Sequence, residues 1–157
     1  MIKMYPQNAV QLTSSDIIRN YIYGGRGIVK LKSPSGNEHH YMFQKPLEKD
    51  SFPDDVIFVY AVHDQEKKFY IGMIENNQFR LTRHSRFLPD NDIVKGAFFI
   101  MNMMKSQSLV DNTQMELYHM GICARCGRRL ESEKALKYGI GRKCMQILNR
   151  NSTETTV

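Results

Sequence analysis

The sequence predicts an α+β fold in which an antiparallel β-sheet of about five strands is packed by one main helix and followed by a treble-clef or zinc-ribbon-like module. Short runs of apolar and β-branched residues recur between turn residues over residues 27–82. Residues 89–104 then carry apolar side chains at helical spacing. All three cysteines lie between His119 and Cys144, which indicates a separate local site. We therefore divide the chain into an α+β body over 1–113, a Cys3His zinc module over 114–150 and a mobile tail over 151–157.

The body begins with a helix and a hairpin. Residues 16–23 form a short helix, because side chains that cap helices precede them and two glycines follow. Residues 27–33 and 37–43 form a hairpin, because Pro-Ser-Gly lies between them and apolar residues alternate with lysines in the first run. A three-stranded meander is expected over 56–62, 68–74 and 78–82.

The main helix is expected over residues 89–104, where an acidic start precedes an apolar stripe. Residues 106–113 read as a loop, and residues 116–118 as a short strand that leads into the cysteine segment. The longest apolar run is 97–104, which is far shorter than the roughly 20 residues of a membrane-spanning helix. The N-terminus has no apolar region of the signal-peptide type. We expect a soluble, cytoplasmic protein.

The cysteines have the spacing of a zinc site. Cys123 and Cys126 form a Cys-x2-Cys turn whose backbone amides point at the sulfur atoms, and Gly127 suits its left-handed bend. Cys144 is placed in the first turn of a helix, where free amide groups favour a thiolate. Structural zinc takes four nitrogen or sulfur ligands. We expect one structural zinc ion bound by His119, Cys123, Cys126 and Cys144.

An alternative for His119 stays open. The histidine can instead pair with the sheet, which leaves the fourth ligand to water or another side chain. A Cys-x2-Cys pair alone is also typical of a redox dithiol, but the third cysteine and the flanking glycines favour metal binding.

Positive charge is concentrated in the same segment. From His119 to Arg150 there are eight lysines and arginines but only two acidic residues, which accounts for the whole formal net charge of +6. A localised basic excess is typical of a surface for an anionic partner, commonly nucleic acid. The expected contact residues are the cations and two tyrosines that can stack on bases: Arg125, Arg128, Arg129, Arg142, Lys143, Tyr118 and Tyr138.

The cysteine segment resembles the C-terminal signature of a family of short, uncharacterised phage and prophage proteins. That signature is H-x-G-x-C-x-x-C-G-R-x-L followed by G-x-G-x-x-C. Residues 27–43 and 59–82 are similar to the hairpin and meander of the same family. Arg142 stands where the family commonly has a proline. The resemblance implies a phage origin, a zinc module and the host-cell cytoplasm, but no particular activity. The matching residues are His119, Gly121, Cys123, Cys126, Gly127, Arg128, Leu130, Gly139, Gly141 and Cys144.

The meander also bears some likeness to the paired strands of GIY-YIG nucleases. Tyr60 and Tyr70 would be the two tyrosines, Arg80 or Arg83 the arginine, and Glu116 the metal-binding glutamate. Phe58 occupies the place of the first glycine of that pattern, and the arginine should lie on a helix, whereas residues 78–84 alternate like a strand. Two paired aromatic strands of an ordinary sheet explain the same residues.

Three functional hypotheses follow. The leading one is a non-enzymatic phage accessory protein whose zinc module presents a basic face to nucleic acid or to a host complex that handles nucleic acid. The second is an inhibitor of a bacterial defence system that acts by protein–protein contact. The third is a GIY-YIG-like nuclease.

Overall fold

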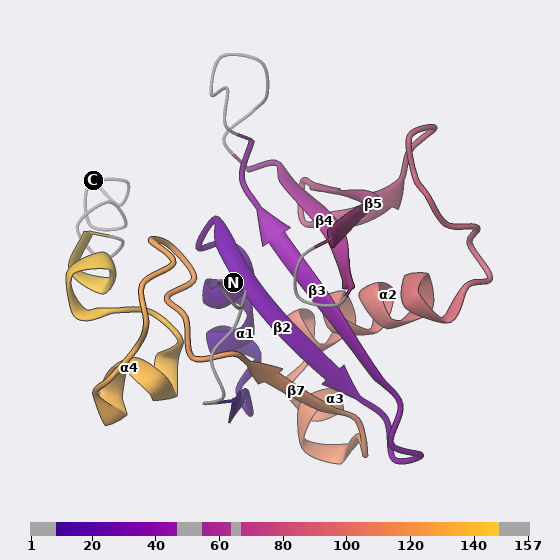
Figure 1. Cartoon of the computed structure of the whole chain (residues 1–157). Helices are drawn as coiled ribbons and strands as arrows, with labels where there is room; N and C mark the ends of the chain where they lie inside the picture. The colour runs from indigo at the N-terminus through magenta and orange to yellow at the C-terminus, as the bar shows by residue number, and fades with distance from the viewer. Residues whose placement is uncertain (1–8, 47–54, 64–66, 148–157) are drawn as a thin grey trace.

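The computed structural model describes residues 9–46, 55–63 and 67–147. The fold is α+β, with helices α1 and α2 packed against one face of a seven-stranded antiparallel sheet (Figure 1). The strand order is β1-β7-β2-β3-β4-β5-β6. The strands are β1 (Val10–Gln11), β2 (Arg26–Lys32), β3 (Glu38–Gln44), β4 (Ile57–His63), β5 (Lys67–Glu75), β6 (Gln78–Leu81) and β7 (Glu116–His119). The helices are α1 (Ser15–Ile22), α2 (Asp92–Lys105), α3 (Gln107–Asn112), α4 (Glu133–Tyr138) and a last helix over 142–147.

The α+β class is confirmed, but the expected sheet of about five strands is wrong, because the sheet has seven. Strand β7 joins the sheet by pairing with β2, as Leu117 lies opposite Leu31. Strand β1 then pairs with the outer side of β7. A two-residue strand is too short to show any alternation of apolar and polar residues, so the sequence pattern carried no signal for β1.

Two short helices were also missed. The segment 106–113, expected as a loop, contains α3, whose start is capped by the Ser106 side chain accepting from the Leu109 amide. The link between the Cys-x2-Cys turn and the last helix contains α4, which is capped by Ser132 and ends at Gly139 in the left-handed region (φ 71°). Both helices have six residues, so a helical apolar stripe is barely visible in either.

One face of the sheet holds the core. In β4, Ile57 and Val59 are fully buried while Phe58 and Tyr60 are half-buried, as expected for a strand with one face covered. Tyr41 of β3 ties the sheet to α2, because its buried hydroxyl donates to the carbonyl of Ile93 at 2.6 Å. The other face of the sheet carries no helix among the described residues.

A β-bulge interrupts the pairing of β4 with β5. The register shifts between Val59 and Tyr60, so that Val59 lies opposite Gly72 while Tyr60 lies opposite Tyr70. The residue between, Ile71, is the additional one on β5 and is fully buried. The bulge therefore lets Tyr60 and Tyr70 meet on the face that the helices do not cover.

Candidate metal centre

Three cysteines from two separate segments meet at one point. The Sγ atoms of Cys123, Cys126 and Cys144 all lie within 4.8 Å of one another, and the group could hold a metal ion. Cys123 and Cys126 lie in the turn that follows β7, and Cys144 lies in the helix over 142–147. The meeting of these three residues is what their spacing predicted.

The Cys-x2-Cys turn is held by its own backbone. The amide of Gly127 donates to the carbonyl of Cys123 at 3.0 Å, and the amide of Cys123 donates to the carbonyl of Arg128 at 2.8 Å. Gly127 has φ of +77°, a conformation that residues with a side chain rarely adopt. The turn is therefore closed by hydrogen bonds of its own backbone.

Backbone and side-chain donors surround the sulfurs. The Sγ of Cys123 accepts from the amides of Gly141 at 3.3 Å and Arg125 at 3.5 Å. Burial opposes ionisation of the Cys123 thiol, but these hydrogen bonds outweigh it, and the pKa of Cys123 is lowered. Burial raises the pKa of Cys144, although the Arg125 guanidinium lies 3.7 Å from its Sγ and acts in the opposite direction. A bound cation would favour all three thiolates.

His119, the expected fourth ligand, lies outside this group. Its side chain is fully buried, and its ring stacks on Tyr21 with centroids 5.5 Å apart. The Nδ1 atom accepts from the amide of Gly121 at 3.0 Å, and Nε2 donates to the carbonyl of Leu136. Both ring nitrogens thus have backbone partners, but these lie after β7 and in α4 and not in the sheet, where the alternative for His119 expected them. Among the described residues, the metal-binding group has three ligands.

The cysteine turn packs directly on the body. The amide of Arg26 donates to the carbonyl of Ala124 at 2.7 Å, and the Tyr21 hydroxyl donates to the carbonyl of Ile122 at 3.1 Å. The side chains of Cys123, Ala124, Leu130 and Ile140 belong to the same buried cluster as the sheet and α1. The position of the three sulfurs is therefore fixed against β2 and α1.

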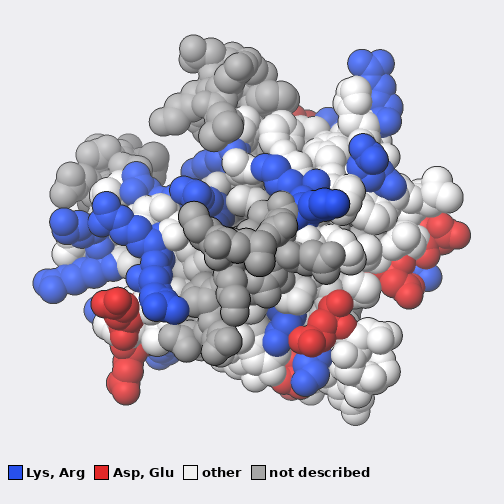
Figure 2. Space-filling model, viewed as in Figure 1, with Lys and Arg blue, Asp and Glu red and all other residues white. Residues whose placement is uncertain are grey.

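The predicted contact cations all lie on the surface. Arg125, Arg128, Arg129, Arg142 and Lys143 are exposed, and Tyr118 and Tyr138 are half-buried. Figure 2 shows basic side chains gathered at the left of the molecule, over α4 and the last helix. Tyr118 lies elsewhere, on β7, where its hydroxyl donates to Glu116 and Lys30 Nζ lies 4.9 Å from its ring centroid.

Two of the predicted contact residues, Tyr138 and Arg142, meet in a pocket. The pocket has a volume of about 450 Å³ and lies between α4 and the helix over 142–147. The sequence did not single out Lys134, which lines the same pocket from the first turn of α4. In the sequence, Lys134 differs in no way from the other lysines and arginines of the basic segment. The lining residues are Ser132, Lys134, Ala135, Tyr138, Ile140, Arg142, Met145 and Gln146.

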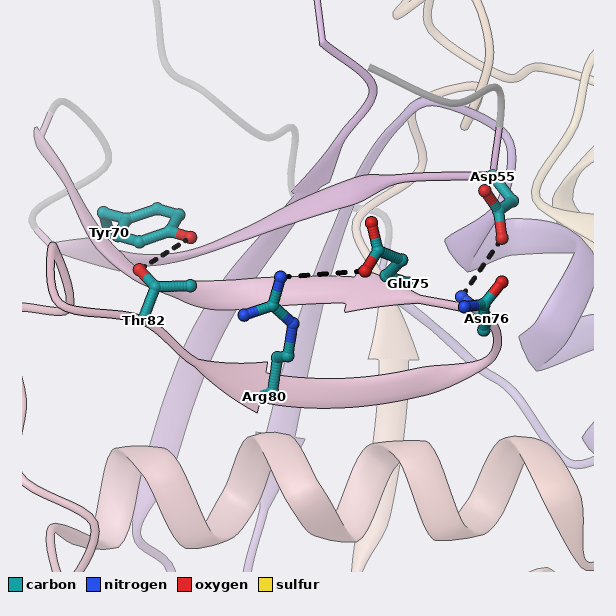
Figure 3. Close-up of polar contacts among 6 residues, drawn as sticks. All are labelled: Asp55, Tyr70, Glu75, Asn76, Arg80 and Thr82. Atoms are coloured by element: carbon teal, nitrogen blue, oxygen red, sulfur yellow. Dashed lines mark hydrogen bonds and ion pairs between the residues drawn. The ribbon is translucent and has the colours of Figure 1, made fainter.

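The residues expected of a nuclease are divided between two places. Tyr60 and Tyr70 are opposed, with ring centroids 5.9 Å apart. Figure 3 shows Arg80 of β6 reaching toward Glu75 of β5, which it contacts at 3.7 Å, and Tyr70 in contact with Thr82. Glu116 lies on β7, and three strands separate β7 from β5 in the sheet. At roughly 4.8 Å per strand, about 19 Å separates the tyrosine pair from that carboxylate. Arg83, the other candidate arginine, is exposed after β6.

Within the described ranges, no helix has both the length and the apolar character needed to span a bilayer. Comparison of the chain with family models, with curated proteins and with solved structures finds no match in any of the three.

Proposed function

We propose that this chain is a phage accessory protein, without catalytic activity of its own, that binds nucleic acid through a zinc-stabilised basic module. The observation that carries the proposal is the pocket between α4 and the last helix. Its lining combines an aromatic ring, Tyr138, with two cations, Lys134 and Arg142, and with the polar side chains of Ser132 and Gln146.

Zinc is the metal that suits the cysteine group best. Three thiolates are soft ligands, and they select zinc over the hard cations that prefer oxygen. Cys123, Cys126 and Cys144 would hold the ion, with the fourth position taken by water or by another side chain. With a side chain in the fourth position the ion would be structural, and it would join the Cys-x2-Cys turn to the helix that carries Arg142.

The metal would also assemble the basic surface. Arg125 and Arg128 lie within or beside the Cys-x2-Cys turn, while Arg142 and Lys143 lie next to Cys144 in the helix. The cysteines thus connect two groups of arginines and lysines that are distant in sequence. Rigid placement of cations lowers the entropy lost when phosphates bind.

The pocket has the chemistry of a nucleotide contact. A tyrosine ring can stack on any base, and the flanking cations can neutralise the phosphates on either side. Lys137 Nζ lies 5.5 Å from the Tyr138 ring centroid, which adds a further positive charge at the rim. The apolar side chains of Ile140 and Met145 also line the pocket, where they can pack against a base.

The test is fluorescence anisotropy with a labelled DNA duplex and with a labelled single strand of the same length. Arg142→Ala is expected to weaken binding of the duplex and of the single strand by roughly tenfold or less. The slope of log K against log salt should fall by about one unit, because one phosphate contact is lost. Lys95→Ala is the matched control, since Lys95 is an exposed cation on α2, outside the basic module.

Two outcomes would contradict the proposal. One is that Arg142→Ala binds the duplex and the single strand with the same affinity as Lys95→Ala. The other is binding that barely changes with salt, which would favour the protein–protein contact of an inhibitor.

A further inference from the structure

We propose that the face of the sheet opposite the helices is a second binding site, specific for single-stranded nucleic acid, on which bases stack against Tyr60 and its neighbours. The proposal rests on the proposed function only in the class of partner, because the residues that form this site, apart from Tyr118 of β7, lie outside the basic module.

The strand alternation places a row of aromatic side chains on this face. Phe58 and Tyr60 on β4 alternate with the buried Ile57 and Val59, so they point away from the helices. The bulge brings Tyr70 of β5 opposite Tyr60. All three aromatic side chains are half-buried, which leaves ring surface available to a ligand.

The rings are arranged edge to face. The Tyr60 and Tyr70 centroids are 5.9 Å apart with an interplanar angle of 70°, and the Phe58 and Tyr70 centroids are 6.1 Å apart at 78°. Thr82 fixes Tyr70 by a hydrogen bond between the two hydroxyls at 3.3 Å (Figure 3). Such contacts hold the rings in place before a ligand binds.

Cations lie beside these rings. Lys68 Nζ is 4.5 Å from the Tyr60 ring centroid and donates to the Gln44 side chain at 2.9 Å. Arg80 of β6 is exposed on the same face, since it lies opposite Met73, which in turn lies opposite Phe58. At the other side of the sheet, Lys30 Nζ lies 4.9 Å from the Tyr118 ring centroid. The face thus repeats one unit, an aromatic ring with a lysine over it.

The spacing of the two units suits an extended strand of nucleic acid. Tyr118 is on β7 and Tyr60 is on β4, so three strand spacings, or about 14 Å, separate them across the sheet. An unpaired strand can place bases on both rings once the lysines over them turn toward its phosphates. Lys30 would then have to leave its ion pair with Glu38, whose carboxylate is 3.1 Å from its Nζ. A duplex cannot place bases in this way, because its bases are stacked on one another and are not available to a flat surface.

The chain has no tryptophan, which allows a direct test. In Tyr60→Trp, the only indole emission of the protein comes from this face. Titration with unlabelled oligo-dT is expected to quench that emission with the same midpoint as the anisotropy of a labelled strand, whereas a duplex is expected to leave it unchanged. Phe98→Trp is the matched control, since Phe98 is an exposed aromatic residue of α2 on the helical side. Its emission should stay constant.

Affinity measurements provide the second arm. Tyr60→Ala is expected to weaken single-strand binding by about tenfold and to leave duplex binding unchanged, because a stacked base contributes about that factor. Tyr60→Phe retains the ring and should keep wild-type affinity, and Lys68→Gln should show a smaller, salt-dependent loss. These two conservative variants keep the test decisive if Tyr60→Ala does not fold.

The failure of this inference is distinct from the failure of the proposed function. If Arg142→Ala weakens binding while Tyr60→Trp emission does not respond to oligo-dT, the sheet site is overturned and the basic module stands. If Tyr60 variants alone change affinity, the module is overturned and the sheet site stands. A dimer that forms with rising protein concentration and is lost in Lys68→Gln would overturn the inference in favour of a second copy of the chain on this face.

Discussion

At the scale of single residues, His119 decides what kind of metal site this is. A histidine four residues before a Cys-x2-Cys pair has the spacing of a ligand, yet its ring lies in the core with both nitrogens bonded to backbone groups. To bind a metal, the ring would have to release Leu136 or Gly121 and leave a buried polar group without a partner. We therefore propose a structural role for this histidine.

His119→Gln tests that role. We expect the variant to keep its bound zinc but to lose about 1–3 kcal/mol of unfolding free energy, because glutamine cannot make both hydrogen bonds and stack on Tyr21. Metal content by elemental analysis and urea denaturation would measure the two effects. Cys126→Ser is the matched comparison and should lose the metal. Loss of zinc in His119→Gln as complete as in Cys126→Ser would show that the ring is a ligand after all.

The same residue predicts a dependence of stability on pH. Burial lowers the pKa of His119 in the folded state, although its bond to Leu136 acts in the opposite direction. The unfolded chain takes up this proton near pH 6.5 and the folded chain only at lower pH. The stability that the neutral ring contributes is present above about pH 6.5 and is lost as the pH falls from there through the folded-state pKa.

We therefore expect the unfolding free energy of the wild type to fall more steeply between pH 7 and pH 5 than that of His119→Gln. The difference in slope should reach up to about 1.4 kcal/mol per pH unit. Both proteins keep the same cysteines and His40, whose pKa is also lowered by burial, so these groups cancel in the comparison. Parallel curves from urea denaturation would refute the assignment.

At the scale of elements, the end of α1 and the cysteine turn approach each other without space for a side chain. A Cβ atom on Gly24 would lie 2.7 Å from the Cβ and 2.8 Å from the carbonyl oxygen of Ala124. That carbonyl accepts the amide of Arg26 at the start of β2. Because the obstacle is backbone, any added methyl group has to move the turn that carries Cys123 and Cys126.

Gly24→Ala is accordingly expected to lower the unfolding free energy by about 1–3 kcal/mol and to weaken zinc binding. A competition titration against a chromogenic chelator would measure the metal affinity. Gly36→Ala is the control, because Gly36 has φ of +92° in the hairpin turn and no atom within 4 Å of an added Cβ. This variant should lower the unfolding free energy by about 1–2 kcal/mol through backbone strain and leave the metal affinity unchanged. Equal metal affinity in the two variants would argue against the coupling.

The elements that the sequence predicted are those with a strong local signal. The main helix has a cap at Asn91 and an apolar stripe, and the hairpin has turn residues between alternating runs. The meeting of the three cysteines was predicted because the spacing of Cys123, Cys126 and Cys144 in the sequence is that of a zinc site. Strand β1 could not be predicted, because it depends on which strand lies beside β7 in the folded sheet. The setting of His119 could not be predicted either, because its ring contacts Tyr21 of α1, Gly121 and Leu136 of α4. The pocket at Tyr138 depends in the same way on how α4 packs beside the last helix.

At the scale of the whole molecule, the cysteine segment and the body share one core. Buried side chains of the segment, such as Ala124 and Leu130, pack in the same cluster as Ile18 and Val29. We expect a bound metal to add to the stability of this segment, because it would join the Cys-x2-Cys turn to the last helix. The two proposed binding surfaces therefore depend on the metal to different degrees. We expect the cations of the module to need it, whereas the rings on the sheet are held by strand pairing.

Removal of zinc should separate the two surfaces. With a strong chelator present, we expect duplex affinity to fall and the plot of log K against log salt to become less steep, by about one unit for each phosphate contact that the module loses. Quenching of the Tyr60→Trp emission by oligo-dT should persist, because β4 and β5 do not contain a cysteine. Cys144→Ser should reproduce the effect of the chelator without any added reagent. A chelated protein that has lost its zinc but retains the full salt slope would mean that the cations hold their positions without the metal, and the role assigned to the three thiolates would then be wrong.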